Sequence, residues 1–347
     1  MALFNHSEFD NHEQVVFCSD AETGLKAIIA VHSTALGPAV GGCRLWDYES
    51  DEAALNDVLR LSRGMTYKNA MAGLPLGGGK AVILGDAKKI KSEALFRAFG
   101  RMVHRLSGTY YSAEDVNITT ADIMIVNKET PYVAGLEGQS GNPAPFTALG
   151  TYRGIKAAAK HQFGSDDLNG KTVAVQGLGS VGFYLCEHLH KEGAKLIVTD
   201  INQDAVQRAV TQFGATAVDL DAIYAVDADI YAPCALGATL NDDTIPQLKV
   251  RVVAGCANNQ LKEARHGEVL RQKGILYTPD YVINAGGIIN VAFEMRPEGY
   301  SAEESTQKVM AIYDTLLNLF QRADAENKPT SQVADLMAQE IIKRGKV

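Results

Sequence analysis

The sequence predicts an α/β protein with two domains, and three observations carry that prediction. At 347 residues the chain is longer than one ordinary domain. Its second half alternates strand-like and helix-like segments, which is typical of a parallel sheet with helices on both faces. A glycine motif typical of nucleotide-binding sheets stands at the head of that alternation. We therefore expect an N-terminal α/β domain and a doubly wound, Rossmann-type domain.

The composition is that of a globular protein, with 46% hydrophobic and 21% charged residues. A net charge of −8 argues against a nucleic-acid or anionic-membrane surface. The chain shows no secretory signal and no apolar stretch of the roughly 20 residues that a membrane helix needs. Its five scattered cysteines suit reduced thiols better than a disulfide framework or a metal site. We expect a cytoplasmic protein without nucleic-acid, membrane or metal partners.

Apolar spacing defines the expected elements of the first half. Apolar residues at helical spacing, with acidic residues in the first turn, predict a helix from residue 51 to about residue 68. Ser92 is a typical cap for a second helix. The glycine-rich stretch 73–79 is expected to be a loop that leads into a strand at 81–84. Further expected elements are strands at 13–18, 25–31 and 110–115 and a helix at 121–126.

In the second half, strands and helices follow a small, polar, proline-rich stretch at 138–145. This stretch is the expected linker or hinge. The expected strands are 172–176, 195–199, 229–232, 251–254 and 274–277. The expected helices include 147–160, 303–323 and 331–343.

The strongest local motif begins where the strand 172–176 ends. The sequence there follows the pattern G-x-G-x-x-G and then continues with helical spacing. Its glycines suit a tight turn, close approach of the backbone to a pyrophosphate, and close packing of helix on strand. The alternative is a glycine-rich turn in an ordinary α/β core. We predict that a dinucleotide binds here, at Gly177, Leu178, Gly179, Ser180, Val181 and Gly182.

Asp200 ends the second strand of this unit and indicates which dinucleotide binds. A carboxylate at this position accepts hydrogen bonds from a ribose diol and would repel a 2′-phosphate. The following residues, Asn202 and Gln203, supply no arginine that would reverse this preference. We therefore expect the cofactor to be NAD rather than NADP.

Two lysines and an aspartate in the first half are candidates for chemistry. Lys80 directly follows Gly77–Gly79, a bare stretch of backbone that something can approach closely. An ammonium group removed from water has a lowered pKa, which suits proton exchange near neutral pH. Lys68 could equally be a cation at a helix C-terminus, and Asp115 an ordinary loop carboxylate. Together with NAD they would bind an anionic substrate and move protons at a carbonyl or an amine.

At these residues the chain resembles the family of amino-acid dehydrogenases that act on glutamate, leucine, valine and phenylalanine. The resemblance is carried by Arg63–Ala70 followed by Leu76–Lys80, and it is closest to the leucine-specific members. Further matching stretches are 36–39, 113–116, 232–237, 257–260 and 279–287. The resemblance implies reversible oxidative deamination of an L-amino acid to a 2-keto acid and ammonia with NAD. It also implies a homo-oligomer, from dimer to octamer.

The resemblance assigns roles to residues on both sides of the reaction. Lys68 would hold the substrate carboxylate, Lys80 would bond the reacting oxygen and activate water, and Asp115 would shuttle protons. The substrate would lie against Gly77 and Gly78. Further cofactor contacts would be Thr147, Ala235, Asn259, with its neighbour Asn258, and Asn284.

The resemblance also implies a domain division, with the last helix returning to the first domain. We expect residues 1–135 with 328–347 to form the substrate and oligomerisation domain, and residues 136–327 the NAD-binding domain. The two would close over the substrate and exclude water.

The expected side-chain pocket is apolar. Glutamate-specific relatives carry a lysine and a serine where this chain has Val40 and Val291, so a second carboxylate would be buried at high cost. The expected lining is Val40, Met65, Ala113, Ile288 and Val291. Leucine-type relatives carry leucine at the position of Val40 and alanine at that of Cys43. The resemblance to the leucine-specific members makes leucine the first expected substrate, and these two differences leave phenylalanine or tryptophan as alternatives.

Two other functions compete with this interpretation. An NAD-dependent 2-hydroxy-acid dehydrogenase would need a histidine acid/base backed by a carboxylate. His188 and His190 lie in the helix after the glycine turn and match no such motif. A non-catalytic NAD sensor on the same fold would have lost Lys80 or Asp115, and this chain has both.

Overall fold

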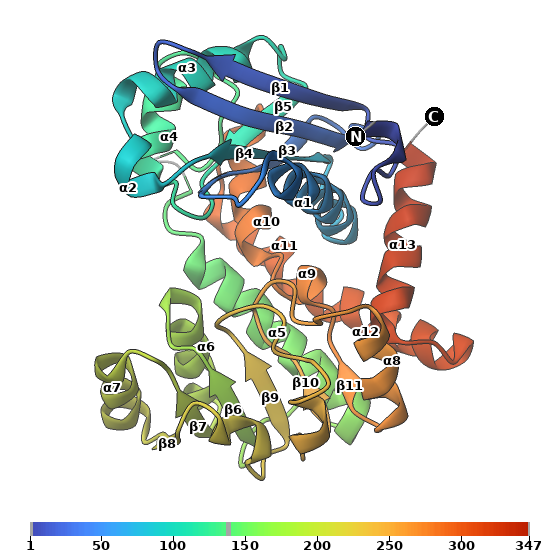
Figure 1. Ribbon diagram of the computed structural model, residues 1–347. Helices are drawn as coiled ribbons and strands as arrows, with labels where there is room; N and C mark the ends of the chain where they lie inside the picture. The colour runs from blue at the N-terminus through green and yellow to red at the C-terminus, as the bar shows by residue number, and fades with distance from the viewer. Residues whose placement is uncertain (1–2, 137–139, 346–347) are drawn as a thin grey trace. The chain divides into compact units, whose positions relative to one another are not determined.

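The structure is a computed structural model that describes residues 3–136 and 140–345 (Figure 1). It divides into two compact units, which are described separately. The first comprises Met1–Gly141, Val291–Tyr300 and Ala338–Val347, and the second comprises Asn142–Asn290 and Ser301–Met337. The chain first passes between the units inside the expected linker 138–145, of which residues 138 and 139 lie outside the described residues.

Besides ending the first unit's first segment at Gly141 instead of residue 135, this division differs from the expected domain boundaries in two places. Residues 291–300 belong to the first unit, where the Glu294 carboxylate accepts hydrogen bonds from the N–H groups of Gly135 and Ser140 at 2.8 and 3.1 Å. Residues 328–337 belong to the second unit, where Asp335 accepts a hydrogen bond from the Tyr281 hydroxyl at 2.8 Å. Both differences arise from contacts between segments far apart in the sequence.

The first unit is built on a five-stranded mixed sheet with the order β1-β2-β4-β3-β5. Strands β1 and β2 form an antiparallel hairpin, β2 is also antiparallel to β4, and β3 is parallel to both β4 and β5. The strands are β1 (Gln14–Asp20), β2 (Leu25–Ser33), β3 (Ala39–Trp46), β4 (Gly77–Leu84) and β5 (Tyr110–Ala113). The helices are η1 (Leu3–Asn5), α1 (Asp51–Met71), α2 (Ala87–Ile90), α3 (Glu93–His104) and α4 (Thr120–Asn127).

Helices cover both faces of this sheet, so its central strands are buried on both sides. On one face Ile29 of β2 packs in a cluster with Phe96 of α3. On the other face its neighbour Ile28 packs in a cluster with Val58 of α1. The alternation follows from the period of two along a strand. As expected from the sequence, the Ser92 side chain caps α3 by accepting the Leu95 N–H at 3.2 Å.

The second unit holds a six-stranded, wholly parallel sheet with the order β11-β10-β9-β6-β7-β8. Counted along the chain from β6, the order is 6-5-4-1-2-3, the doubly wound arrangement of dinucleotide-binding sheets. The strands are β6 (Thr172–Gln176), β7 (Lys195–Thr199), β8 (Thr216–Ala217), β9 (Ile230–Pro233), β10 (Val252–Val253) and β11 (Leu276–Tyr277). The order reverses between β6 and β9, where such sheets bind ligands at the carboxyl ends of the strands.

Small residues let helices of this unit pack closely. A Cβ on Gly154 of α5 would lie 2.4 Å from Ile283 Cγ1, and one on Gly150 would lie 2.7 Å from Ile312 Cδ1. From α5 to α9 the helices are α5 (Ala144–Phe163), α6 (Ser180–Lys191), α7 (Gln203–Phe213), η2 (Ala222–Ala225), η3 (Ile245–Gln247), α8 (Arg265–Gln272) and α9 (Asp280–Ile283). The remaining helices of the chain are α10 (Gly286–Ala292), η4 (Phe293–Met295), α11 (Ala302–Met310), α12 (Ile312–Glu326) and α13 (Thr330–Gly345).

The expected fold class is confirmed, with four corrections to individual elements. Strands β3 and β8 were not expected. The glycines 77–79, expected in a loop, begin strand β4. The single helix expected at 303–323 is divided at Ala311, whose N–H donates to the Lys308 carbonyl three residues back rather than four. In the described residues, no helix is long and apolar enough to cross a membrane.

Candidate active site

An ion pair between Lys80 and Asp115 marks the candidate site in the first unit. Lys80 lies on β4, and Asp115 follows the end of β5. The Lys80 Nζ atom is 2.8 Å from Asp115 Oδ2, and the two side chains are 8% and 23% exposed. The sheet therefore brings together two residues that the sequence singled out separately.

Arg44 of β3 is a second cation on the same carboxylate, and sequence reasoning did not identify it. Its Nε atom donates to Asp115 Oδ2 at 3.3 Å, and its Nη1 atom donates to Asp57 Oδ2 at 2.9 Å. The Tyr48 hydroxyl donates to the same Asp57 oxygen at 2.6 Å. Arg44 is unusual because it is a charged residue in a mostly apolar stretch. Since the sequence did not predict β3, nothing indicated that Arg44 lies beside Asp115.

The two cations determine the charge of Asp115. Burial acts to raise the pKa of the Asp115 carboxyl, but Lys80 and then Arg44 outweigh it, so the pKa lies below its usual value. Asp115 is therefore a carboxylate at neutral pH. Such a group can take a proton from a substrate ammonium and return it later.

The glycines of β4 make room for other parts of the protein. A Cβ on Gly78 would lie 2.0 Å from the Thr66 nitrogen of α1, one on Gly77 2.1 Å from the Ser33 oxygen, and one on Gly79 2.7 Å from Tyr110 Cδ2. The space without side chains is thus filled by the chain itself. The glycines were expected to leave room for a ligand, but the room is needed by the chain itself. Contact of the substrate with the main chain of Gly77 and Gly78 stays a prediction.

The expected pocket residues of the first unit lie on elements next to these glycines. Val40 pairs with Gly78 across β3 and β4, and Ala113 ends β5. Met65 of α1 reaches Gly41, where a Cβ would lie 3.1 Å from Met65 Cγ. Val40 is fully buried, whereas Met65 and Ala113 are partly exposed.

Three further expected residues lie on helices. Lys68 is half-buried in the last turn of α1. Val291 belongs to the first unit and Ile288 to the second. Both are partly exposed residues of α10.

The glycine turn of the second unit has the shape expected for a phosphate cradle. Gly177 has φ +100°, and a Cβ there would lie 2.8 Å from Ala235 Cβ. A Cβ on Gly182 would lie 2.1 Å from the Gly177 oxygen, which allows α6 to pack closely on β6. Gly179, the cap of α6, has nothing within 4 Å of a Cβ, so its missing side chain leaves open space at the helix N-terminus. The residues present fit a dinucleotide.

Asp200 lies directly beside this turn. Its Oδ2 atom accepts the Leu178 N–H at 2.5 Å, and its Oδ1 atom accepts the Asn202 N–H at 2.7 Å. A carboxylate has further lone pairs, so Asp200 can still accept hydrogen bonds from a diol.

Asn284 carries a buried acceptor without a hydrogen-bond partner in the part of the chain that the structure describes. Its Nδ2 atom donates to the Cys256 carbonyl at 3.0 Å and to Asn258 Oδ1 at 2.7 Å. Its Oδ1 atom has no hydrogen-bond partner among the described residues, although Asn284 is only 5% exposed. Because a buried unpaired acceptor is costly, this atom fits a donor such as a carboxamide of the cofactor. Of the other expected contacts, Thr147 Oγ1 donates to the Pro143 carbonyl at 3.1 Å and Asn259 has φ +52°.

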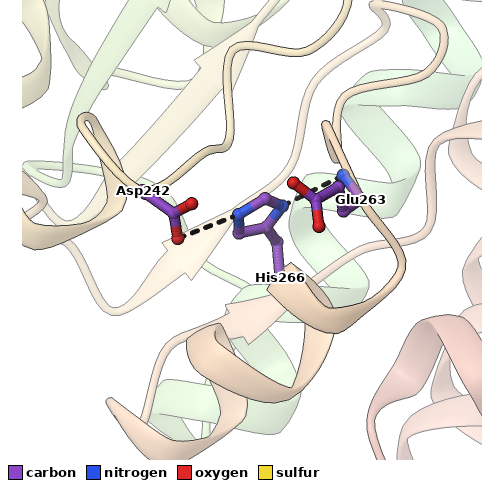
Figure 2. Close-up of side chains that lie close together, drawn as sticks. All are labelled: Asp242, Glu263 and His266. Atoms are coloured by element: carbon purple, nitrogen blue, oxygen red, sulfur yellow. Dashed lines mark hydrogen bonds and ion pairs between the residues drawn. The ribbon is translucent and has the colours of Figure 1, made fainter.

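A separate cluster in the second unit has three potential metal ligands, Asp242, Glu263 and His266 (Figure 2). His266 Nδ1 accepts the Glu263 N–H at 3.0 Å, and its Nε2 atom lies 3.3 Å from Asp242 Oδ1. Arg265 donates to Asp242 and, at 2.9 Å, to Glu263. The arginine compensates both carboxylates, so the cluster is a side-chain network that joins the start of α8 to the segment between β9 and η3, which holds Asp242.

Comparisons with known proteins agree with the motifs. Residues 12–135 match the family model described as "Glu/Leu/Phe/Val dehydrogenase, dimerisation domain". Residues 138–203 and 198–344 match the model described as "Glutamate/Leucine/Phenylalanine/Valine dehydrogenase".

Full-length relatives belong to the same family. The chain is 60% identical to leucine dehydrogenase of Geobacillus stearothermophilus, over 99% of this chain and 94% of that one. It is 49% identical to L-tryptophan dehydrogenase of Nostoc punctiforme, over 100% and 98%. A crystal structure of the latter superposes with a TM-score of 0.87 over 97% of both chains, at 48% identity.

A structure with much lower sequence identity has the same fold. Glutamate dehydrogenase of Thermus thermophilus has a TM-score of 0.79 at 22% identity, over 96% of this chain and 89% of that one. The resemblance inferred from the motifs is confirmed: this chain belongs to the Glu/Leu/Phe/Val dehydrogenase family and is an oxidoreductase that deaminates amino acids.

Proposed function

We propose that this chain catalyses the NAD-dependent, reversible oxidative deamination of a branched-chain L-amino acid, with leucine as the preferred substrate. The observation that carries the proposal is the ion pair of Lys80 with Asp115, 2.8 Å apart and mostly buried. A buried carboxylate with a cation beside it suits proton transfer at an amine and charge stabilisation at a carbonyl oxygen.

The substrate preference is supported by relatives and by the pocket residues. Leucine dehydrogenases of several organisms are 58–60% identical to this chain over almost its whole length. The expected lining residues Val40, Met65, Ala113, Ile288 and Val291 offer no partner for a charged substrate side chain.

An aromatic substrate is the second candidate. L-tryptophan dehydrogenase at 49% identity and phenylalanine dehydrogenase of Caldalkalibacillus thermarum at 46% favour it. Because one methylene in an apolar pocket changes selectivity by only about 10–200-fold, a direct assay must rank the substrates. The 2-hydroxy-acid alternative has no support, since the chain belongs to an amino-acid dehydrogenase family.

The proposed mechanism uses three side chains of the first unit. Lys68 binds the substrate carboxylate. Asp115, kept ionised by its two cations, removes a proton from the substrate ammonium, so that the amine lone pair can assist loss of hydride from Cα. A dinucleotide held at the glycine turn would supply the hydride acceptor. Water adds to the resulting iminium carbon and gives up one proton to solvent, and the Lys80 ammonium stabilises the oxygen of this adduct. Asp115 then returns its proton to the amine, the C–N bond breaks as the hydroxyl loses its remaining proton, and ammonia and the 2-keto acid are released.

NAD is proposed as the cofactor because Asp200 lies at the glycine turn. Its carboxylate suits a ribose diol and would repel a 2′-phosphate. The open space at Gly179 and the Asn284 Oδ1 atom, which has no partner among residues 3–136 and 140–345, support a dinucleotide in the second unit.

We also propose that the chain forms a homo-oligomer and resides in the cytoplasm. The first proposal is supported by the family model for residues 12–135, which is described as a dimerisation domain. The second is supported by the five cysteines, all of which are free thiols, as is usual in a reducing compartment.

The experiment that tests the proposal is a screen of NADH formation with each proteinogenic L-amino acid and several L-2-hydroxy acids. We expect the highest kcat/KM with leucine, and aromatic amino acids ranking first would establish the second candidate instead. Lys80→Ala should abolish turnover while NADH binding persists. The matched control Lys88→Ala, at an exposed position of α2, should behave like the wild type. Near-wild-type deamination by Lys80→Ala would refute the assigned mechanism.

A further inference from the structure

Two of the five cysteines differ from the rest in exposure and surroundings. Cys234 follows β9 and Cys256 follows β10, and both are partly exposed. Cys18, Cys43 and Cys186 are buried. The proposed deamination uses none of these thiols.

Cys234 and Cys256 lie on adjacent segments just beyond the parallel ladder of β10 and β9. The ladder ends at the pair of Val253 with Tyr231, three residues before each cysteine. The segments stay side by side beyond the ladder, because the Ala257 N–H donates to the Pro233 carbonyl at 2.9 Å. Neighbouring strands lie roughly 5 Å apart, within the range of about 4.4–6.8 Å that Cα atoms joined by a disulfide span.

The two thiols act on each other's pKa. The hydrogen bond from the Cys256 thiol lowers the pKa of Cys234 and raises that of Cys256. Cys234 is thus the better nucleophile and Cys256 is positioned as its partner.

Each cysteine also belongs to a loop that carries an expected cofactor contact. The Cys234 N–H donates to the Gln176 carbonyl at 2.7 Å, and a Cβ on Gly182 would lie 3.4 Å from Cys234 Cβ. The Cys256 carbonyl accepts the Asn284 side chain at 3.0 Å. The thiol pair therefore links the glycine turn to the segment that holds Asn284.

We propose that Cys234 and Cys256 form a redox-active dithiol that a hydroperoxide converts to an intramolecular disulfide. The Cys234 thiolate attacks one peroxide oxygen, the O–O bond breaks, and a sulfenic acid and one water form. The Cys256 sulfur then attacks the Cys234 sulfur, the S–O bond breaks, and a second water leaves. In total, two thiols and one hydrogen peroxide give one disulfide and two waters. The two sulfurs lose two electrons and the peroxide gains them.

The disulfide should weaken dinucleotide binding, an effect that rests on the proposed function of the glycine turn. A covalent bond draws the sulfurs closer than the hydrogen-bonded contact does. The backbone at Cys234 packs tightly against the glycine turn: a Cβ on Gly177 would lie only 2.8 Å from the Cys234 carbonyl carbon. A movement of Cys234 toward Cys256 should therefore disturb the turn. Because coupling between two equilibria is reciprocal, bound NADH should in turn oppose disulfide formation.

The test uses the purified full-length chain, titrated with hydrogen peroxide. Free thiols are counted in denaturant, and cross-linked peptides are identified by mass spectrometry. We expect two of the five thiols to be lost, as a 234–256 cross-link that dithiothreitol reverses. Oxidation should weaken NADH binding by roughly tenfold. Cys256→Ser should prevent the cross-link, whereas the matched control Cys186→Ser should still form it.

Three results would overturn the proposal. One is that all five thiols remain after a peroxide treatment that fully oxidises a small model dithiol under the same conditions. The others are a cross-link through Cys186 and a cross-link between two chains. These readouts do not depend on NADH, so reduced protein that fails to bind NADH would refute the proposed cofactor site instead. A 234–256 disulfide with unchanged NADH affinity would overturn the coupling to the glycine turn.

Discussion

Replacing Arg44 tests whether two cations keep Asp115 ionised. The Arg44 Nε atom lies 3.3 Å from Asp115 Oδ2, so the direct attraction is about 5 kcal/mol at an effective dielectric constant of about 20. The loss of this attraction has a smaller effect on Asp115 than that figure, because both side chains are partly exposed and because Lys80 still stabilises the carboxylate. Opposite charges at such distances typically lower a carboxyl pKa by about 1–3 units. We expect Arg44→Met to raise the pKa of Asp115, because Lys80 alone then opposes the effect of burial.

The pH profile of kcat/KM reports this change. A general base must be unprotonated, so activity falls as the pH drops through the pKa of Asp115. In Arg44→Met the acidic limb should therefore move to higher pH, while Arg44→Lys, which keeps the charge, should recover part of the shift. Arg60→Met, at an exposed position of α1, is the control and should leave the limb in place. A folded Arg44→Met variant with an unchanged acidic limb would refute this account of Asp115.

Three further predictions concern the cofactor and the stability of the first unit. Asp200→Ser should narrow the preference for NAD over NADP, and an unchanged ratio of kcat/KM values would contradict the ribose contact. Burial lowers the pKa of His32 from 6.5 to about 4, so its stabilising contribution is present above pH 6.5 and is lost as the pH falls toward 4. Urea unfolding at these two pH values should show a loss of up to about 3 kcal/mol, which His32→Gln should reduce. Gly78→Ala should destabilise by about 1–3 kcal/mol or more, because its methyl group meets Thr66, whereas Gly64→Ala, with nothing within 4 Å, should not lower the Tm.

The second unit could be predicted from the sequence because its signals are local. Strand β6, the glycine turn and Asp200 follow one another within about one strand–helix–strand unit. Each is recognised by its neighbours in the chain. The strands 172–176 and 195–199 have the expected bounds.

The first unit could be predicted less well, because its site depends on contacts across the sheet. Strand β3 contains Gly41 and Gly42, which weaken a strand pattern. A Cβ on Gly41 would lie 1.9 Å from the Gly79 oxygen, so these glycines are required by a strand that is distant in the chain. Without β3, Arg44 could not be placed beside Asp115. Lys80 was found because its position after three glycines is unusual within the local sequence.

The filled space around Gly77–Gly79 affects how mutational data on this enzyme should be interpreted. A substitution there pushes against Ser33, Thr66 or Tyr110 before any ligand is present. In a selection for growth or activity, these positions would therefore score as intolerant even if none of them touched the substrate. Measuring the amount of folded protein in parallel separates the two causes. For positions whose Cβ would meet the chain's own backbone, loss of abundance rather than loss of turnover is the expected phenotype.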